Sequence, residues 1–170
     1  MIKVLLKSLA LSLIIALMLR AILLTIQYEF FFEVDFKFWS TLFDHSCFGV
    51  LKNIEWSNSA TLSKIIFAPI FEGLQFALVI FLALKVKFPK LLIVAMITVI
   101  AYFLHAPIGN EFYPIQASVS FAVYTLFYFH LMSLSTKPHI HAYSFTTIAH
   151  ALYNFVGVYL VALYKLDGVF

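Results

Sequence analysis

A long apolar run, residues 65–84, restricts where this chain can fold more strongly than any other stretch. At ~1.5 Å per residue, a helix of this length crosses the ~30 Å hydrocarbon core of a bilayer. The run carries one ionisable residue, Glu72. An ionised carboxylate in hydrocarbon is costly unless it is paired, so Glu72 is a candidate functional residue whose partners have to be found.

The composition of the whole chain agrees with a membrane location. Of its 170 residues, 64% are hydrophobic and 11% are charged, whereas a soluble domain is about half apolar and a quarter charged. Too few polar residues remain to cover a surface in water. The sequence therefore predicts an all-α, polytopic membrane protein that forms one helical bundle, and its scattered lysines argue against nucleic-acid binding.

Five apolar segments predict about five transmembrane helices. They cover residues 4–27, 64–85, 91–106, 115–134 and 142–164. The first begins like a signal peptide, but its apolar stretch continues through Arg20 to about Gln27 and no small-x-small cleavage site stands out. We therefore expect 4–27 to be a retained anchor helix.

The stretch 28–63 differs from these spans because it is aromatic-rich, mixed in charge and without a long apolar run. Rings with a polar edge prefer the headgroup region, so we expect an external amphipathic linker with a short interfacial helix near 36–51. In the segment 56–64, a Ser or Thr is expected to cap the next helix.

The basic residues predict the orientation of the bundle. The turns 85–90 and 135–141 contain lysines, whereas the linker 107–114 contains none and 28–63 is more acidic than basic. Because cytoplasmic loops are enriched in Lys and Arg, this pattern predicts a cytoplasmic N-terminus and an external C-terminus.

With this orientation, the polar residues of the spans gather in the outer half of the bilayer. They are Glu72, His105 at the end of the third span, His150 and Asn154 in the fifth, and Arg20 in the first. His150 and Asn154 stand four residues apart, so they project from one helix face.

These residue types predict a hydrolytic site that needs no metal or cofactor. Glu72 and His105 would together deprotonate a water molecule for attack on a carbonyl carbon. His150 and Asn154 would donate hydrogen bonds to the oxyanion that then develops.

The order of these residues resembles the CPBP family of glutamic intramembrane proteases, which includes CAAX-processing endopeptidases and relatives called abortive-infection or bacteriocin-immunity proteins. The resemblance is carried by APIFEGLQF (68–76), a histidine at the end of the next helix, and HALYN (150–154). It covers about residues 64–160 and implies a protease-like core of about 64–164. It implies proteolysis of a membrane-anchored peptide or protein, in a prokaryotic inner membrane.

The chain also departs from the family pattern. Gly73 and Ala77 stand where the family's first motif has a second Glu and an Arg, and Ala101 replaces the Phe of the second motif. The third motif, H-x-x-x-N, is intact. Arg20, predicted at a depth similar to that of Glu72, is the candidate substitute for the missing Arg.

Other functions remain open at this stage. The missing Glu and Arg favour a catalytically inactive relative that acts as a membrane binding or immunity protein. Cys47, the single cysteine, excludes an intramolecular disulfide but permits a sorting transpeptidase with a thiol nucleophile. A proton-coupled transporter is the third alternative, although no internal repeat supports it.

Each candidate residue also has a purely structural interpretation. Glu72 can be a carboxylate paired with Arg20 or a tyrosine, and Arg20 can be an anchor that extends its charge toward the interface. His150 and Asn154 can be hydrogen-bonding contacts between membrane helices. The oligomeric state does not follow from the sequence.

Overall fold

The computed structural model describes residues 2–26, 47–54, 56–106 and 112–166, and this part of the chain is helical without a strand. The all-α prediction is therefore confirmed. The elements are α1 (Ile2–Ile26), α3 (Cys47–Lys52), α4 (Ser59–Leu62), the π-helix η2 (Ser63–Phe67), α5 (Ala68–Lys85), α6 (Lys90–His105), α7 (Phe112–Leu134) and α8 (Pro138–Leu166).

Four helical segments of the described chain are long and apolar enough to cross a membrane. They are Lys3–Leu23, Ser59–Lys85, Tyr113–Leu134 and Pro138–Leu163. The fifth predicted span, α6, is apolar but has 16 residues. At ~1.5 Å per residue it reaches about 24 Å, less than the thickness of the hydrocarbon core.

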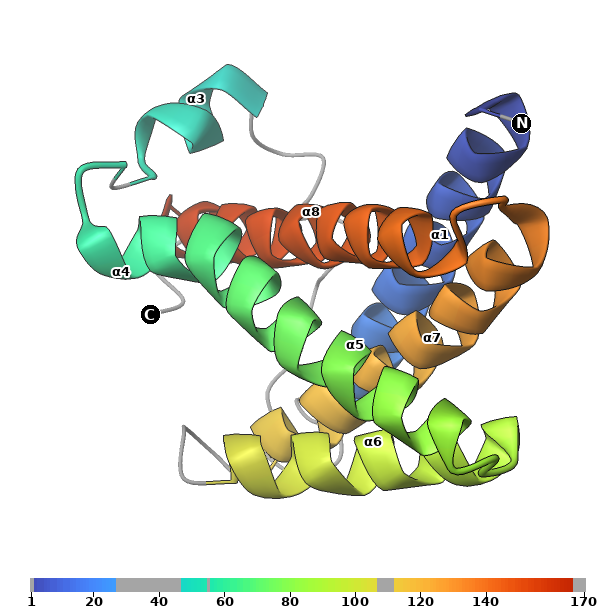
Figure 1. Cartoon of the computed structure of the whole chain (residues 1–170). Coiled ribbons are helices and arrows are strands. Elements are labelled where there is room, and N and C mark those ends of the chain that lie inside the picture. Colours follow the sequence, from blue (N-terminus) through green and yellow to red (C-terminus); the bar gives the residue numbers. More distant parts are fainter. Residues whose placement is uncertain (1, 27–46, 55, 107–111, 167–170) are drawn as a thin grey trace.

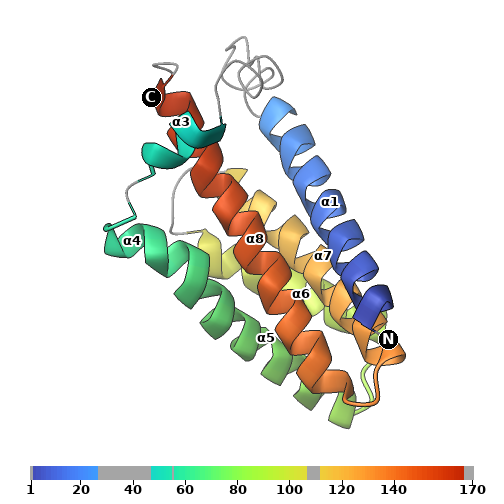
Figure 2. The ribbon, with the colours of Figure 1, turned by 90° about the horizontal axis from the view of Figure 1, so that it is seen from above.

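Helix α8 runs through the middle of the bundle (Figure 1). Helix α8 packs against α5, α7 and α1, whereas α6 packs mainly against α7. Figure 2 shows the N-terminus and the α5–α6 and α7–α8 turns at one end, and α3 with the end of α8 at the other. The lysines of the two turns and of the N-terminus therefore lie at the same end of the bundle.

The main core forms where α6 packs against α7. Ile93, Ile97, Ala101 and His105 repeat every fourth residue of α6 and are all buried, as expected for one face of a helix. Ala101 is fully buried, so this small residue lies within the α6 core. His105 is the last member of this stripe.

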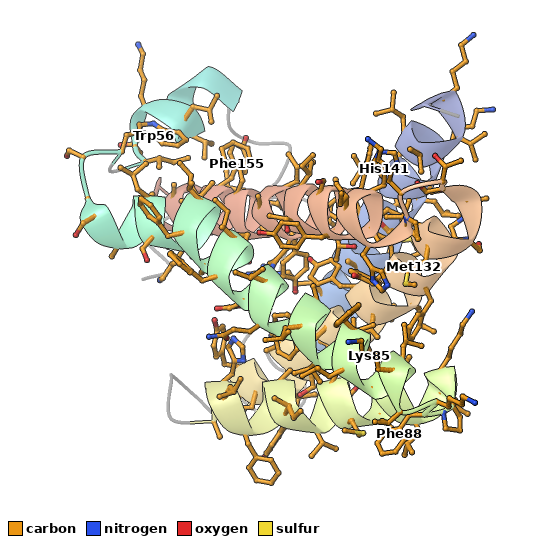
Figure 3. All side chains as sticks on the ribbon, in the orientation of Figure 1. Trp56, Lys85, Phe88, Met132, His141 and Phe155 are labelled. Atoms are coloured by element: carbon orange, nitrogen blue, oxygen red, sulfur yellow. The ribbon has the colours of Figure 1, made fainter. Side chains whose placement is uncertain are left out.

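A second, smaller cluster joins α3 to the end of α8. Val50 and Ile54 pack with Leu160 and Leu163, and Trp56 stacks on Phe155 with ring centroids 6.2 Å apart (Figure 3). Within the predicted interfacial helix near 36–51, only the part from residue 47 lies in the described chain, where α3 begins.

The start of the second span differs from the sequence-based expectation. We expected a Ser or Thr cap, but the side chain of Asn58 accepts the hydrogen bond from Ala60 N at 2.9 Å, and α4 begins at Ser59. Asn is as good an N-cap as Ser because its side-chain oxygen reaches the same orphan N–H groups.

The fully buried Ile97 provides a test of the α6–α7 core. We expect Ile97→Ala to lower the free energy of unfolding by about 2–4 kcal/mol, because it removes buried methyl groups and leaves a cavity. Val99→Ala is the matched control on the same helix, since Val99 is 54% exposed. Equal losses in the two variants, measured by unfolding in detergent, would contradict this packing.

Candidate functional site

One face of α8 carries the polar side chains that meet α5. Tyr143, Thr147, His150 and Asn154 are spaced by four, three and four residues, so they form one stripe along the helix. The Tyr143 hydroxyl donates a hydrogen bond to Ile70 O at 3.2 Å. The remaining members of the stripe lie beside the first half of α5, where Glu72 is placed.

Glu72 and His150 are brought together as the sequence predicts. His150 Nε2 lies 3.8 Å from Glu72 Oε2, and the side chains are 9% and 29% exposed, respectively. This distance allows an ion pair but exceeds that of a direct hydrogen bond. The carboxylate therefore has a nitrogen partner from a different helix and remains partly accessible.

His105 approaches the same region from α6. Its Nδ1 donates to Ala101 O at 2.8 Å, because a carbonyl oxygen can only accept. In the neutral ring, Nε2 then carries no proton and can accept one. His105 is close enough to Glu72 and His150 to interact electrostatically with both, but within the described chain no hydrogen bond or ion pair joins it to Glu72.

An aromatic side chain separates the two histidines. Phe121 of α7 lies with its ring centroid 5.9 Å from that of His105 and 5.2 Å from that of His150. The ring of Tyr124, one turn later, is also 5.2 Å from that of His150. These rings restrict the positions that both imidazoles can adopt, and the sequence analysis did not single them out.

Asn154 is placed by an unpaired carbonyl at the start of α5. In η2 the N–H of Ala68 bonds to Ser63 O, five residues back, as in a π-helix. The next carbonyl, Lys64 O, would need the N–H of residue 69, and Pro69 has none. Asn154 Nδ2 donates to Lys64 O at 2.8 Å and satisfies it.

This bond gives Asn154 a structural role that the sequence did not reveal. The bond supplies Lys64 O with the partner that its own helix lacks, so it stabilises the π-helical entrance to α5. The predicted contribution of Asn154 to an oxyanion site stays a prediction.

Arg20 lies in a separate cluster from Glu72. Its guanidinium carbon is 4.8 Å from the centroid of the Tyr153 ring, and its Nε is buried without a hydrogen-bond partner in the described chain. Gly157 makes this position possible, because a Cβ there would lie 2.7 Å from Arg20 Nη1. Within the described chain Arg20 makes no ion pair with Glu72, so its predicted role as a direct counter-ion is not supported by a contact.

The other histidines of the described chain have partners outside this site. His130 contacts Ser8 Oγ at 3.1 Å, His139 contacts the Tyr128 hydroxyl at 3.1 Å, and His141 contacts Ser135 Oγ. In the part of the chain that the structure covers, no group of three His, Cys, Asp or Glu residues could hold a metal ion.

No protein-family model, no curated protein and no solved structure matches this chain. Evidence for a function therefore comes from the Glu72–His150 pair and its surroundings.

The Asn154 bond provides a test of the junction between α8 and η2. We expect Asn154→Ala to lower the free energy of unfolding by about 0.5–1.5 kcal/mol, since it leaves Lys64 O without a partner. Asn53→Ala is the control, because Asn53 makes the same type of bond at the same length, to Gly49 O at 2.8 Å, but to a residue only four positions back rather than between two helical segments. A loss no greater than that of the control, in thermal unfolding, would remove the structural role of Asn154.

Proposed function

We propose that this protein is an intramembrane endopeptidase of the glutamic type, which hydrolyses a peptide bond of a membrane-anchored substrate. The observation that carries the proposal is the 3.8 Å contact between Glu72 and His150, contributed by two spanning helices. Titratable partners inside a membrane are rare and expensive, and they mark functional sites more often than structural ones.

The proposed chemistry uses one water molecule and no cofactor. Glu72, together with Nε2 of His105, accepts a proton from the water, whose oxygen attacks the carbonyl carbon. His150 donates a hydrogen bond to the developing oxyanion, and the second N–H of Asn154 is the other donor we assign. The C–N bond then breaks, and the proton passes to the leaving amine.

The same proposal includes the orientation of the bundle in the membrane and the side toward which the site opens. The lysines of the N-terminus and both turns share one end of the bundle, and we assign this end to the cytoplasm. The site then opens toward the outer half of a prokaryotic inner membrane, as in the sequence-based expectation. Membership of the CPBP family is part of this proposal and rests on the motifs around Glu72, His105 and His150.

A catalytically inactive relative is the second candidate function, and one observation favours it. Arg20 contacts Tyr153 rather than Glu72, so Arg20 does not take the place of the Arg that the family has where this chain has Ala77. In this case the polar stripe of α8 would only hold the bundle together while the protein binds a membrane partner.

Replacement of the carboxylate distinguishes the two functions. We expect Glu72→Gln, expressed in cells that lack the wild-type chain, to abolish all new N-termini that the wild type produces among membrane proteins, because the amide cannot accept a proton. Terminal-peptide mass spectrometry measures this loss. His130→Gln is the control, as His130 lies outside the site, and identical termini in wild type and Glu72→Gln would favour the inactive relative.

The thiol alternative is tested in the same assay. Cys47 lies at the start of α3, and the proposed chemistry gives it no role. We therefore expect Cys47→Ser to produce the same set of new termini as the wild type, within twofold in abundance. A complete loss would instead support a transpeptidase with a thiol nucleophile.

A further inference from the structure

A small, partly open cavity lies between α5, α7 and α8, next to His150. Its volume is about 20 Å³, which is enough for one water molecule. Its walls include Gly73 and Ala77 of α5, Tyr124 of α7, and Thr146 and Thr147 of α8. The cavity thus occupies the region where the family pattern has a second Glu and an Arg.

Three hydroxyl groups at this cavity differ from the other hydroxyls of the described helices. Four hydroxyls, including that of Thr125 at the same cavity, donate to the carbonyl four residues back, at 2.7–2.8 Å: those of Thr98, Ser118, Ser120 and Thr125. Thr146 Oγ1 and Thr147 Oγ1 are buried, yet neither they nor the buried Tyr124 hydroxyl have a hydrogen-bond partner within the described chain.

Three buried hydroxyls without a partner would be costly if the cavity were dry. Each such group loses its bonds to water and gains nothing in exchange. Tyr124 is 3% exposed, so lipid and bulk water do not reach it. A bound water molecule with two to four polar neighbours removes this cost.

Gly73 gives the cavity its space. A Cβ at this position would lie 2.9 Å from Thr147 Oγ1 and 3.5 Å from the Tyr143 ring. Any side chain at residue 73 therefore competes with the Thr147 hydroxyl for the same volume, and glycine leaves that hydroxyl free to bond elsewhere.

We propose that this cavity binds one water molecule, held by the hydroxyls of Thr146 and Thr147 and in contact with the His150 ring. Thr146 and Thr147 precede His150 by four and three residues, so the three side chains share a helix face. The water gives His150 a polar neighbour besides Glu72 and fixes the orientation of its ring. Thr146 and Thr147 are thereby positioning residues, a role that rests on the proposed function, whereas the water site itself does not.

Unfolding experiments test the water site without any substrate. We expect Thr146→Val and Thr147→Val each to lower Tm by roughly 2–4 °C, because the isosteric change removes a bond to water. Thr98→Val is the matched control, since the Thr98 hydroxyl bonds within its own helix, and its Tm should stay within ~1 °C of the wild type. Thr147→Ser should retain the wild-type Tm.

The opposite sign of the effect would overturn the water site. In a dry cavity, valine removes an unsatisfied hydroxyl, so both valine variants would be as stable as the wild type or more stable. An experimental structure that shows ordered solvent gives a second measurement. A solvent peak within hydrogen-bonding distance of both threonine hydroxyls supports the proposal, and its absence from well-defined density contradicts it.

The positioning role is tested by the terminal-peptide assay. We expect Thr147→Val to reduce the new termini at least tenfold and Thr147→Ser to restore them, a recovery that a purely steric role of the side chain would not require. Normal activity in a Thr146→Val, Thr147→Val double variant would refute the role. Stability effects without any Glu72-dependent termini would leave the water site standing and reject only the proposed function.

Discussion

The pairing of α5 with α8 is the contact on which the rest of the site depends. Lipid is as apolar as leucine, so membrane helices are not driven together by the hydrophobic effect and rely on close packing and polar contacts. The segment formed by η2 and α5 meets α8 through three such contacts: Asn154 on Lys64 O, His150 beside Glu72, and Tyr143 on Ile70 O. These contacts join residues 64–72 to residues 143–154 of α8, and Glu72 is itself one of the residues that they hold.

Pro69 is the residue that makes this pairing specific. By lacking an N–H, it leaves Lys64 O without a partner from its own helix, so a donor from another helix can take that place. Asn154 is that donor. Sliding α8 by one turn would separate this bond and the Glu72–His150 contact at once, so both oppose a change of register. The proline that interrupts the helix thereby helps to align the two candidate catalytic side chains.

The sequence could predict the helices and the meeting of Glu72 with His150, because both follow from hydrophobicity and from the cost of a charge in lipid. It could not predict the partner of Asn154, since a backbone carbonyl becomes available only when η2 forms a π-helix ahead of Pro69. The sequence also could not predict the position of the Arg20 side chain. That position depends on the absence of a side chain at Gly157, which is far from Arg20 in the sequence. The predicted depth of Arg20 in the bilayer was similar to that of Glu72, but packing determines the direction in which the Arg20 side chain points.

Gly73 lies where α5 and α8 approach each other closely. With Thr147 Oγ1 only 2.9 Å from where a Cβ would stand, α5 and α8 lie too close for a glutamate at this position unless Thr147 moves. The polar group that meets α5 at this point is therefore the Thr147 hydroxyl of α8, which adds no net charge. Arg20 packs on Tyr153 rather than on Glu72. Within the described chain, the charge of Glu72 is then balanced through its contact with His150.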